Sequence, residues 1–564
     1  MNIPHQTITE ALLANAGGQP FVSLWRPDEE PEIVTYSFDE FLALARSFAR
    51  LYLDRGIKSG DTIILIMSSG VSVMAAFAGG LLLGAVPTIL AFPTFKVDPE
   101  KYRLGLAGVT RNLSARLVVI DSEFPKHLLS EIAMHPSTEL LEAPTEFAAA
   151  DRPLPEVDTA PDKVAFIQHS AGTTGLQKGV ALTHRAVLNQ LRHLSTSLEL
   201  STDDRIISWL PLYHDMGLIA CFVLPMVCRL HVVMQSPTDW VMRPSSMLQL
   251  ASTYRCSLGW MPNFSFQMLA KRVDPDEPAR LNLKAMKGII NCSEPVRFQS
   301  MNAFAETYAV SGFPPTATQA SYAMAENTFA VTQSALARPA KTIWVDRNRF
   351  LTDRIVVEVS PATPNVLPLT SSGTCLDNNW VRILDENGRP HPNGFVGDVV
   401  IRSDSMFDGY YNRPDLTAKV LADGWYSTRD VGFVVDGELF VIGRRDDTII
   451  TSGRNVYPQD LEEIASQHPA IHSGRTVAFG LYSAELGTDE VAIVAEVNDE
   501  ADLARRHTIE AEIRKAILAD FGISTRCIHV VGPKWIIKST AGKPARSSTK
   551  ARFLAECPEF NSGV

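Results

Sequence analysis

Short apolar segments alternate with longer amphipathic ones along the first half of the chain, and this alternation constrains the fold most. The apolar segments are runs rich in Val and Ile, at 62–67, 117–121, 164–168, 231–235 and 288–292. The stretches between them are long enough for helices. One of these, residues 37–58, opens with Ser37 and Glu40 at the spacing of a capping box. The alternation predicts an α/β protein with largely parallel sheets.

The longest apolar stretch, Val71–Phe92, is broken by Gly79, Gly80, Gly84 and Pro87. These breaks favour a buried helix followed by a buried strand over a transmembrane span. The seven cysteines are scattered and form no CxxC pair, which argues against a disulfide framework or a zinc site. The start of the chain lacks a basic region followed by an apolar run. We therefore expect a cytoplasmic protein without stable membrane insertion.

The net charge of -11 argues against nucleic-acid binding. Residues 534–553 are an exception, because they contain six Lys and Arg residues and no Asp or Glu. Such a run usually forms a solvated face, but it could also attract an acidic carrier protein.

The chain changes character after Val396. Short strands separated by Gly turns follow, which predicts local antiparallel pairing. A final α+β unit begins near Asp446, with helices expected at 458–467 and 502–519.

The segment His169–Gly179 carries the strongest chemical signal. It follows a predicted strand and combines glycines, hydroxyl side chains and Lys178. Glycines let backbone N–H groups approach an anion, and Lys178 adds positive charge, so the loop suits a polyphosphate. It is not a Walker A loop, because the order GK[ST] is absent.

This loop resembles the phosphate-binding loop of the adenylate-forming superfamily, which includes acyl-CoA synthetases. Further motifs follow in the order found in that family. They are Trp209–Leu218 (WLPLYHDMGL), Ser321–Glu326 (SYAMAE), Ser427–Asp430 (STRD), Gly443–Asp446 (GRRD) and Lys538–Lys543 (KSTAGK).

The resemblance implies the α/β adenylate-forming enzyme fold. It predicts a large N-terminal domain, residues 1–445, with several subdomains, parallel sheets and a small β-barrel-like part. A small, mobile α+β C-terminal domain would occupy residues 446–564, with Asp446 at the hinge. The implied activity joins a carboxylate to the AMP part of ATP, with Mg²⁺ as a cofactor, and then passes the acyl group to a thiol.

The resemblance also assigns site residues. The implied catalytic residues are Lys543, Glu326 and Thr174, with Glu326 as the metal ligand. The implied ATP-binding residues are Ser170, Gly172, Thr173, Thr174, Gly175, Lys178, Ser293, Glu294, Pro295, Ser321, Tyr322, Ala323, Asp430, Arg444 and Lys543. The implied acyl-substrate residues are His214, Met261 and Phe264.

These assignments agree with the chemistry of the side chains. A Glu carboxylate is a hard ligand suited to Mg²⁺. A Tyr ring such as that of Tyr322 can stack on adenine. A substrate carboxylate is already ionised at pH 7, so His214 is assigned to positioning and not to general-base catalysis. Lys543 would bridge the attacking carboxylate and the α-phosphate.

Several segments resemble the fatty acyl-AMP ligase branch, which loads acyl-carrier proteins. They include 208–219, 262–264, 294–297 and 453–462, and Ala325 also suits that branch. The segment Trp344–Pro368 resembles the insertion of this branch that hinders transfer to CoA; a tolerated surface loop is the alternative.

We therefore expect a hydrophobic acid as the substrate and the phosphopantetheine of a carrier protein as the acceptor. An acyl-CoA ligase is the alternative, and a catalytically silent nucleotide-binding protein is a third possibility. The apolar segments 222–226 and 259–266 are expected near the acyl pocket. Departures from the family pattern stand at His169, Ala171, Arg429 and Pro544.

Overall fold

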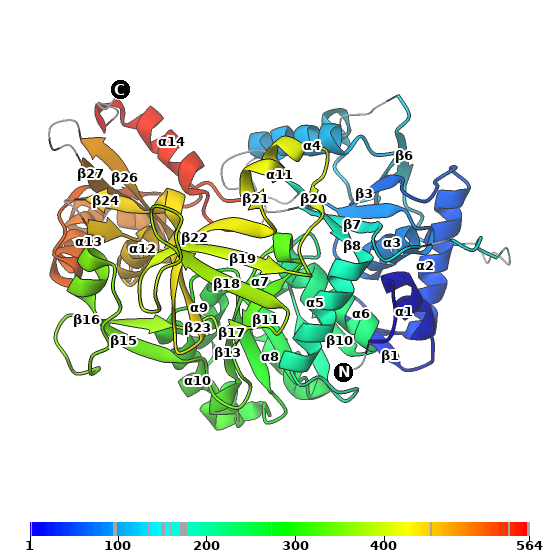
Figure 1. Ribbon diagram of the computed structural model, residues 1–564, viewed down its shortest axis with the longest axis horizontal. Helices are drawn as coiled ribbons and strands as arrows, with labels where there is room; N and C mark the ends of the chain where they lie inside the picture. The colour runs from blue at the N-terminus through cyan, green and yellow to red at the C-terminus, as the bar shows by residue number, and fades with distance from the viewer. Residues whose placement is uncertain are drawn as a thin grey trace.

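The computed structural model describes residue 1 and residues 3–93, 99–132, 136–147, 153–157, 159–169, 178–271, 273–451, 454–483, 486, 488–539 and 542–560. Figure 1 shows the N-terminal elements in blue and cyan at one end and the C-terminal elements in orange and red at the other. Green and yellow strands lie between the two ends. The mixed α/β fold has a large N-terminal part and a smaller C-terminal part, as the sequence predicted.

An all-parallel sheet forms near the N-terminus, with strand order β4-β3-β5-β6. Its strands are β3 (Thr62–Ile66), β4 (Val86–Ile89), β5 (Leu117–Ile120) and β6 (Glu139–Glu142). Helices α2 (Phe38–Leu53), α3 (Val71–Leu82) and α4 (Pro99–Leu113) accompany it. The predicted helix and strand within Val71–Phe92 are thus confirmed as α3 and β4. No helix in the described part of the chain is long and apolar enough to cross a membrane.

Helix α2 begins where the capping box predicts. The Ser37 side chain accepts a hydrogen bond from the Glu40 amide, and the Glu40 carboxylate accepts one from the Ser37 amide. The two bonds satisfy backbone groups that a helix leaves unpaired at its start. The helix ends at Leu53, and Gly56, with a φ of 72°, closes the turn that follows.

A second, larger sheet runs through the middle of the molecule, with strand order β18-β19-β22-β23-β17-β14-β13-β12-β11-β9-β10-β1-β2. The strands from β1 to β13 in this row pair in parallel, apart from edge strand β2. These strands are β1 (Pro20–Trp25), β2 (Ile33–Ser37), β9 (Arg205–Ser208), β10 (His231–Gln235), β11 (Leu258–Met261), β12 (Gly288–Asn291) and β13 (Thr318–Ala323).

The other half of this sheet is antiparallel. It contains β14 (Ala330–Gln333), β17 (Thr374–Cys375), β18 (Asn379–Leu384), β19 (Gly397–Ser403), β22 (Trp425–Val435) and β23 (Glu438–Arg444). These strands form the part that the sequence predicted to be barrel-like. Strand β14 joins them directly to β13, so one hydrogen-bonded ladder crosses both halves.

The predicted strand at 164–168 pairs differently from the parallel strands. It is β7 (Val164–His169), which pairs antiparallel with β8 (Gly179–Thr183), and β8 also pairs with β20 (Gly409–Tyr410). Helix α5 (His184–Ser197) follows β8. The order of apolar and polar residues predicts a buried strand but carries no information about the direction of its partner.

The C-terminal part contains a three-stranded sheet of β26 (Ile471–Ser483), β27 (Thr488–Val497) and β28 (Thr525–Val531). It also contains the small hairpin β24 (Ile449–Thr451) and β25 (Arg454–Val456), and helices α12 (Pro458–Ser466), α13 (Arg506–Phe521) and α14 (Arg546–Glu556). The charged helix predicted from residue 502 starts at Arg506. Asp499 caps a short 3₁₀ helix at Glu500–Arg505 instead.

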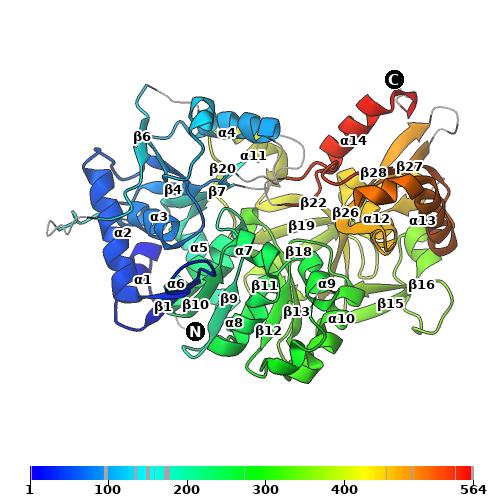
Figure 2. The same ribbon diagram turned by 180° about the vertical axis from the view of Figure 1, so that it is seen from behind.

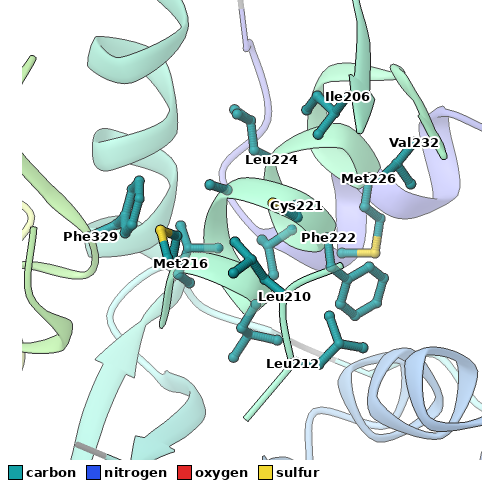
Figure 3. Close-up of a cluster of buried hydrophobic side chains, with 14 of the residues drawn as sticks. Ile206, Leu210, Leu212, Met216, Cys221, Phe222, Leu224, Met226, Val232 and Phe329 are labelled. Atoms are coloured by element: carbon teal, nitrogen blue, oxygen red, sulfur yellow. The ribbon is translucent and has the colours of Figure 1, made fainter. Parts of the chain in front are cut away.

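The last three residues of the WLPLYHDMGL motif begin a buried π-helical stretch, Met216–Val223, which is followed by α6 (Leu224–Cys228). Figure 3 shows Phe222, Leu224 and Met226 among other apolar side chains. The Phe222 ring lies 5.9 Å from Phe77 and 6.1 Å from Phe41. Residues 222–226, expected near an acyl pocket, thus pack into the core against N-terminal helices α2 and α3.

Candidate active site

Glu326 lies in a short 3₁₀ turn directly after β13 and is 9% exposed. Its Oε1 accepts a hydrogen bond from the hydroxyl of Tyr410 at 2.7 Å. Burial and the neighbouring carboxylate raise the pKa of Tyr410, so this tyrosine stays a donor. Tyr410 was not predicted from the sequence, because no local motif marks it. Its strand β20 brings it beside β8.

Lys178 is the one residue of the predicted phosphate-loop set that the structure describes. Its ammonium lies 4.7 Å from the centre of the Tyr410 ring. Burial lowers the pKa of Lys178, and Glu326 opposes that shift. Lys178, Tyr410 and Glu326 therefore form one polar group. The other predicted loop residues, Ser170, Gly172, Thr173, Thr174 and Gly175, and the departure at Ala171, lie outside the described residues.

No group of three or more His, Cys, Asp or Glu side chains gathers as a metal cage within the ranges that the structure describes. Glu326 alone offers a buried carboxylate next to Lys178. This donor set fits Mg²⁺, which keeps most of its waters and binds through one or two carboxylates together with substrate phosphates.

Tyr322, Asp430 and Arg444 meet across three strands. The Tyr322 hydroxyl donates a hydrogen bond to Oδ2 of Asp430. Asp430 on β22 and Arg444 on β23 are direct cross-strand partners, with 3.7 Å between Arg444 Nε and Asp430 Oδ1. Burial raises the pKa of Asp430, and Arg444 partly offsets it. The bond to Asp430 restrains the position of the Tyr322 hydroxyl and so links β13 to β22.

The neighbouring residues of the same motif support that strand. The Ser321 hydroxyl donates to the Thr332 carbonyl on β14 at 2.7 Å, so its role in the structure is to hold the β13–β14 ladder. Ala323 is half-buried at the end of β13. Both residues lie next to Tyr322, as predicted.

The loop at Ser293–Pro295 links the nucleotide side of the site to two other regions. Ser293 has a φ of 70°, and its carbonyl accepts a hydrogen bond from Lys543 Nζ. The Glu294 carboxylate accepts one from the amide of Phe264 at 3.0 Å. The structure thus brings the C-terminal Lys543 to the predicted adenine loop, although 250 residues separate them in sequence.

His214 and Asp215 lie where the chain enters the π-helical stretch. Their side chains are 2.6 Å apart, and Asp215 Oδ1 also accepts the Met216 amide. Burial works to raise the pKa of Asp215, but His214, the Met216 amide and Lys543 together hold it below its ordinary value. Position 217 requires glycine, because a Cβ there would lie 2.3 Å from the Pro211 carbonyl oxygen.

An aromatic group lies beside the predicted acyl residues. Met261 is fully buried at the end of β11, and Phe264 is the second residue of helix α9 (Asn263–Lys271). The rings of Trp209 and Trp240 stack 3.8 Å apart, with an interplanar angle of 5°. Phe264 meets both edge-on, at 6.2 Å and 6.0 Å. Trp240 was missed, because it belongs to no motif and reaches the site through helix α7 (Pro237–Met242).

The predicted hinge residue Asp446 lies in a short 3₁₀ turn, Arg445–Asp447, between β23 and β24. Its carboxylate pairs with Arg429 at 2.7 Å. Arg429 itself has a φ of 62°. The departure from the family pattern at Arg429 thus supplies a contact to the predicted hinge residue.

The segment Trp344–Pro368 contains ends of two paired strands, β15 (Thr342–Asp346) and β16 (Val366–Thr370), and a short π-helical turn, Arg349–Asp353. Phe350 in that turn is buried, with its ring 6.0 Å from Phe433 and 6.4 Å from Tyr457. Phe433 belongs to the large part and Tyr457 to the C-terminal part. The segment therefore lies between the two.

Charged side chains of this segment contact both parts of the molecule. The Arg347 guanidinium contacts the Asp520 carbonyl and lies 4.9 Å from the Phe521 ring centre, both at the end of α13. Two other arginines form ion pairs away from the C-terminal part. Arg349 pairs with Asp353 at 2.5 Å, and Arg354 with Glu386 in the large part at 3.8 Å.

The basic run at 534–553 is largely engaged within the C-terminal part. Arg546 pairs with Asp447 at 2.7 Å and with Glu462 at 2.5 Å. Lys550 donates to the Gly480 carbonyl, and Arg552 pairs with Glu556. The run is therefore not a free basic face, and it does not indicate an acidic carrier protein as a partner.

The AMP-binding enzyme family matches residues 16–411. The chain belongs to this family. The match spans the Lys178, Glu326 and Tyr410 group and the Tyr322 strand, and leaves Asp430, Arg444 and Lys543 beyond its end.

Two relatives and one solved structure match this chain over nearly its whole length. A protein of Caulobacter vibrioides provisionally named an acyl-CoA synthetase is 29% identical, over 97% of this chain and 95% of its own length. A medium-chain-fatty-acid–[acyl-carrier-protein] ligase of Moorena producens is 28% identical, over 93% and 91%. A chain solved in a study of fatty acyl-adenylate ligases from E. coli and L. pneumophila is 27% identical, with a TM-score of 0.89 and 99% coverage of each chain. The AMP-binding enzyme described here is similar to such ligases over nearly its whole length.

Proposed function

We propose that this AMP-binding enzyme activates a fatty or other hydrophobic carboxylic acid with ATP, releasing pyrophosphate, and passes the acyl group from acyl-AMP to the phosphopantetheine thiol of an acyl-carrier protein. The observation that carries the proposal is the bond from Lys543 to the Ser293 carbonyl. This bond supports the proposal because it brings a cation from the C-terminal part to the loop assigned to the adenine.

In the first half-reaction a substrate carboxylate oxygen attacks the α-phosphorus of ATP, and pyrophosphate leaves. The side chains need only align the groups and neutralise charge, because the carboxylate is already ionised. In our proposal Lys543 neutralises charge between carboxylate and α-phosphate, and Lys178 neutralises the leaving pyrophosphate. Bound Mg²⁺ would supply further neutralisation of the phosphates, held through Glu326.

The remaining residues bind the nucleotide and the acid. We assign the ribose hydroxyls to Asp430, which Arg444 contacts. We assign the adenine to Tyr322 and the Ser293–Pro295 loop. The hydroxyls and amides of residues 170–175 are assigned the phosphates. We assign the acyl group to His214, which pairs with Asp215, and to the buried Met261 and half-buried Phe264. The aromatic group of Trp209, Trp240 and Phe264 offers apolar surface suited to a hydrophobic acid.

We place the boundary between the two domains at residues 445 and 446, so that Asp446 lies at the hinge. Three contacts across this boundary support a defined orientation for the first half-reaction: Lys543 to Ser293, Phe350 to Tyr457, and Arg347 to Phe521. The last two come from the segment Trp344–Pro368. A segment that contacts both domains restrains their relative rotation, which is our reason for favouring a carrier protein over CoA as the acceptor.

The names of the relatives include both possible acceptors, an acyl-carrier protein and CoA. The Moorena protein is named as a ligase for an acyl-carrier protein, and the Caulobacter protein is named for CoA. The test is to incubate the enzyme with ATP, Mg²⁺ and a panel of fatty acids and to measure pyrophosphate. CoA or a holo acyl-carrier protein is then added, and the thioester is followed by mass. Efficient acyl-CoA formation by the unmodified enzyme would replace the carrier protein by CoA in the proposal.

A further inference from the structure

Arg297 connects the adenine loop to the C-terminal domain, and none of the roles assigned above uses it. It lies two residues after Pro295 and directly precedes helix α10 (Phe298–Tyr308). Its Nη1 lies 2.7 Å from Asp460 Oδ1, and its Nε lies 3.3 Å from Glu463 Oε2. Both carboxylates stand on α12, three residues apart and so on one face of that helix. Figure 2 shows α10 on the same side of the molecule as α12.

This cluster is buried. The Arg297 side chain is 15% exposed, and those of Asp460 and Glu463 are 10% and 25% exposed. Burial raises the pKa of Glu463, and Arg297 counteracts that shift. A buried charge that loses its partner is strongly destabilising, so each member depends on the others. The ion cluster therefore favours one orientation of α12 relative to the large domain.

The backbone of Arg297 is held just as firmly. Its amide donates to Oδ1 of Asn263 at 3.1 Å, and the same oxygen accepts from Asn291 on β12 at 2.9 Å. Asn263 opens α9 immediately before Phe264 of the proposed acyl site. The base of the Arg297 side chain is thus fixed by the acyl helix and the parallel sheet, and its tip is fixed by the C-terminal domain.

Arg297 and Lys543 act on the same short loop from opposite directions. Lys543 reaches from the C-terminal domain to the Ser293 carbonyl, and Arg297, four residues later, reaches back to α12. We propose that Arg297 is a positioning residue for adenylate formation: through Asp460 and Glu463 it holds the C-terminal domain where Lys543 reaches the nucleotide. Transfer to the thiol then requires this cluster to separate. The effect on adenylate formation rests on the proposed function, whereas the orientation of the C-terminal domain by Arg297 does not.

The chemical test replaces Arg297 by Gln, a shorter polar side chain that removes the charge and cannot span to both carboxylates. Lys543 is labelled in the intact protein by brief acetylation and quantified by mass spectrometry. Lys534, which is exposed in the same C-terminal region, serves as the internal reference. We expect labelling of Lys543 relative to Lys534 to rise several-fold in Arg297→Gln. Unchanged relative labelling in a folded variant overturns the inference, whatever the enzyme's substrate.

The kinetic test separates the half-reactions. We expect Arg297→Gln to lower the kcat of pyrophosphate release about 10–100-fold with little change in the KM for ATP, since displacement of a catalytic group by about 1 Å has costs of this size. Transfer from supplied acyl-AMP should be retained or increased. An equal loss in both half-reactions would mean a merely structural role and would overturn the assignment.

Two further variants show whether the effect passes through α12. Arg297→Gln combined with Asp460→Asn should be no slower than the slower single variant, because both remove the same contact. Gln267→Ala is the matched control: it removes a neutral contact at the same interface, from Ser473 Oγ to Gln267 Oε1 at 2.7 Å. It should change adenylate formation less than about threefold. Additive losses in the double variant contradict the proposed route.

Discussion

Tyr410 donates its hydroxyl hydrogen to the Glu326 carboxylate at 2.7 Å, and the same tyrosine ring faces the Lys178 ammonium at 4.7 Å. One side chain thus touches both the proposed metal ligand and the described lysine of the phosphate loop. The Tyr410 hydroxyl therefore helps to orient the Glu326 carboxylate. This arrangement leads to the first prediction.

Glu326→Ala should lose adenylate formation while the protein stays folded. Loss of a residue that positions a metal ion costs several kcal/mol of transition-state stabilisation, or about 100-fold or more in rate. Tyr410→Phe should leave Glu326 present but less well oriented, and so raise the Mg²⁺ concentration needed for half-maximal pyrophosphate release. Pyrophosphate release by Glu326→Ala equal to that of the unmodified enzyme at limiting Mg²⁺ would show that Glu326 does not hold the ion.

Lys543→Ala should lower adenylate formation by about 100–1,000-fold, the usual cost of removing one group that stabilises developing charge. The variant should still transfer the acyl group from supplied acyl-AMP to a thiol. The two half-reactions are measured separately, by pyrophosphate release and by the mass of the thioester. A variant that fails only in transfer would remove Lys543 from the first step.

Asp446→Pro should keep adenylate formation and lose transfer. Proline fixes φ at the proposed pivot and so restricts the change between two domain orientations. Arg429→Ala is the control, because it removes the 2.7 Å contact to Asp446 without fixing the backbone. If the proline variant transfers as fast as the unmodified enzyme, residue 446 is not the pivot.

Replacing residues 347–365 by a short Gly-Ser link should leave acyl-AMP formation intact and create or increase acyl-CoA formation. This replacement keeps the β15–β16 ladder, in which Trp344 and Pro368 are partners, and removes the contacts of Phe350 and Arg347 with the C-terminal domain. Differences of a few kcal/mol shift the populations of two states strongly. An unchanged ratio of acyl-CoA to acyl-AMP would show that the segment does not control the acceptor.

Mild acid should destabilise the protein through buried histidines. Burial lowers the pKa values of His169, His184 and His231 to about 4, below the ordinary value of 6.5. As pH falls, the unfolded chain therefore binds protons first, so the stability from these groups is complete above pH 6.5 and is lost towards pH 4. Each group costs up to about 2 kcal/mol between pH 6.5 and 5.

The measurement is the free energy of unfolding in urea at pH 7.5 and pH 5.5. His184→Gln should reduce the loss between the two pH values, because it removes one of the three groups. His507→Gln is the control, since that side chain is 81% exposed. Equal losses in the unmodified protein and in His184→Gln would contradict the assignment.

The sequence predicted the local elements and the chemistry of the motifs, because both depend on residues close together in the chain. The capping box of Ser37 and Glu40 and the helix and strand within Val71–Phe92 are examples. Tyr410, Trp240 and Arg297 were not assigned to the site, since each reaches it through tertiary packing that no short pattern encodes. The partner of strand 164–168 was missed for the same reason. The prediction that residues 534–553 could form a free basic face was wrong, because Arg546 is paired with Asp447 and Glu462.

The central sheet has a consequence for how the enzyme can change over time. Tyr322 on β13 and the pair Asp430 and Arg444 on β22 and β23 belong to one continuous ladder. Their amides should therefore be among the slowest to exchange with deuterium, even without nucleotide. Phe264 and Trp240 stand on helices α9 and α7, which are not part of this ladder. New acid preferences can then arise by substitution on those helices, while the geometry proposed to recognise ATP stays as it is.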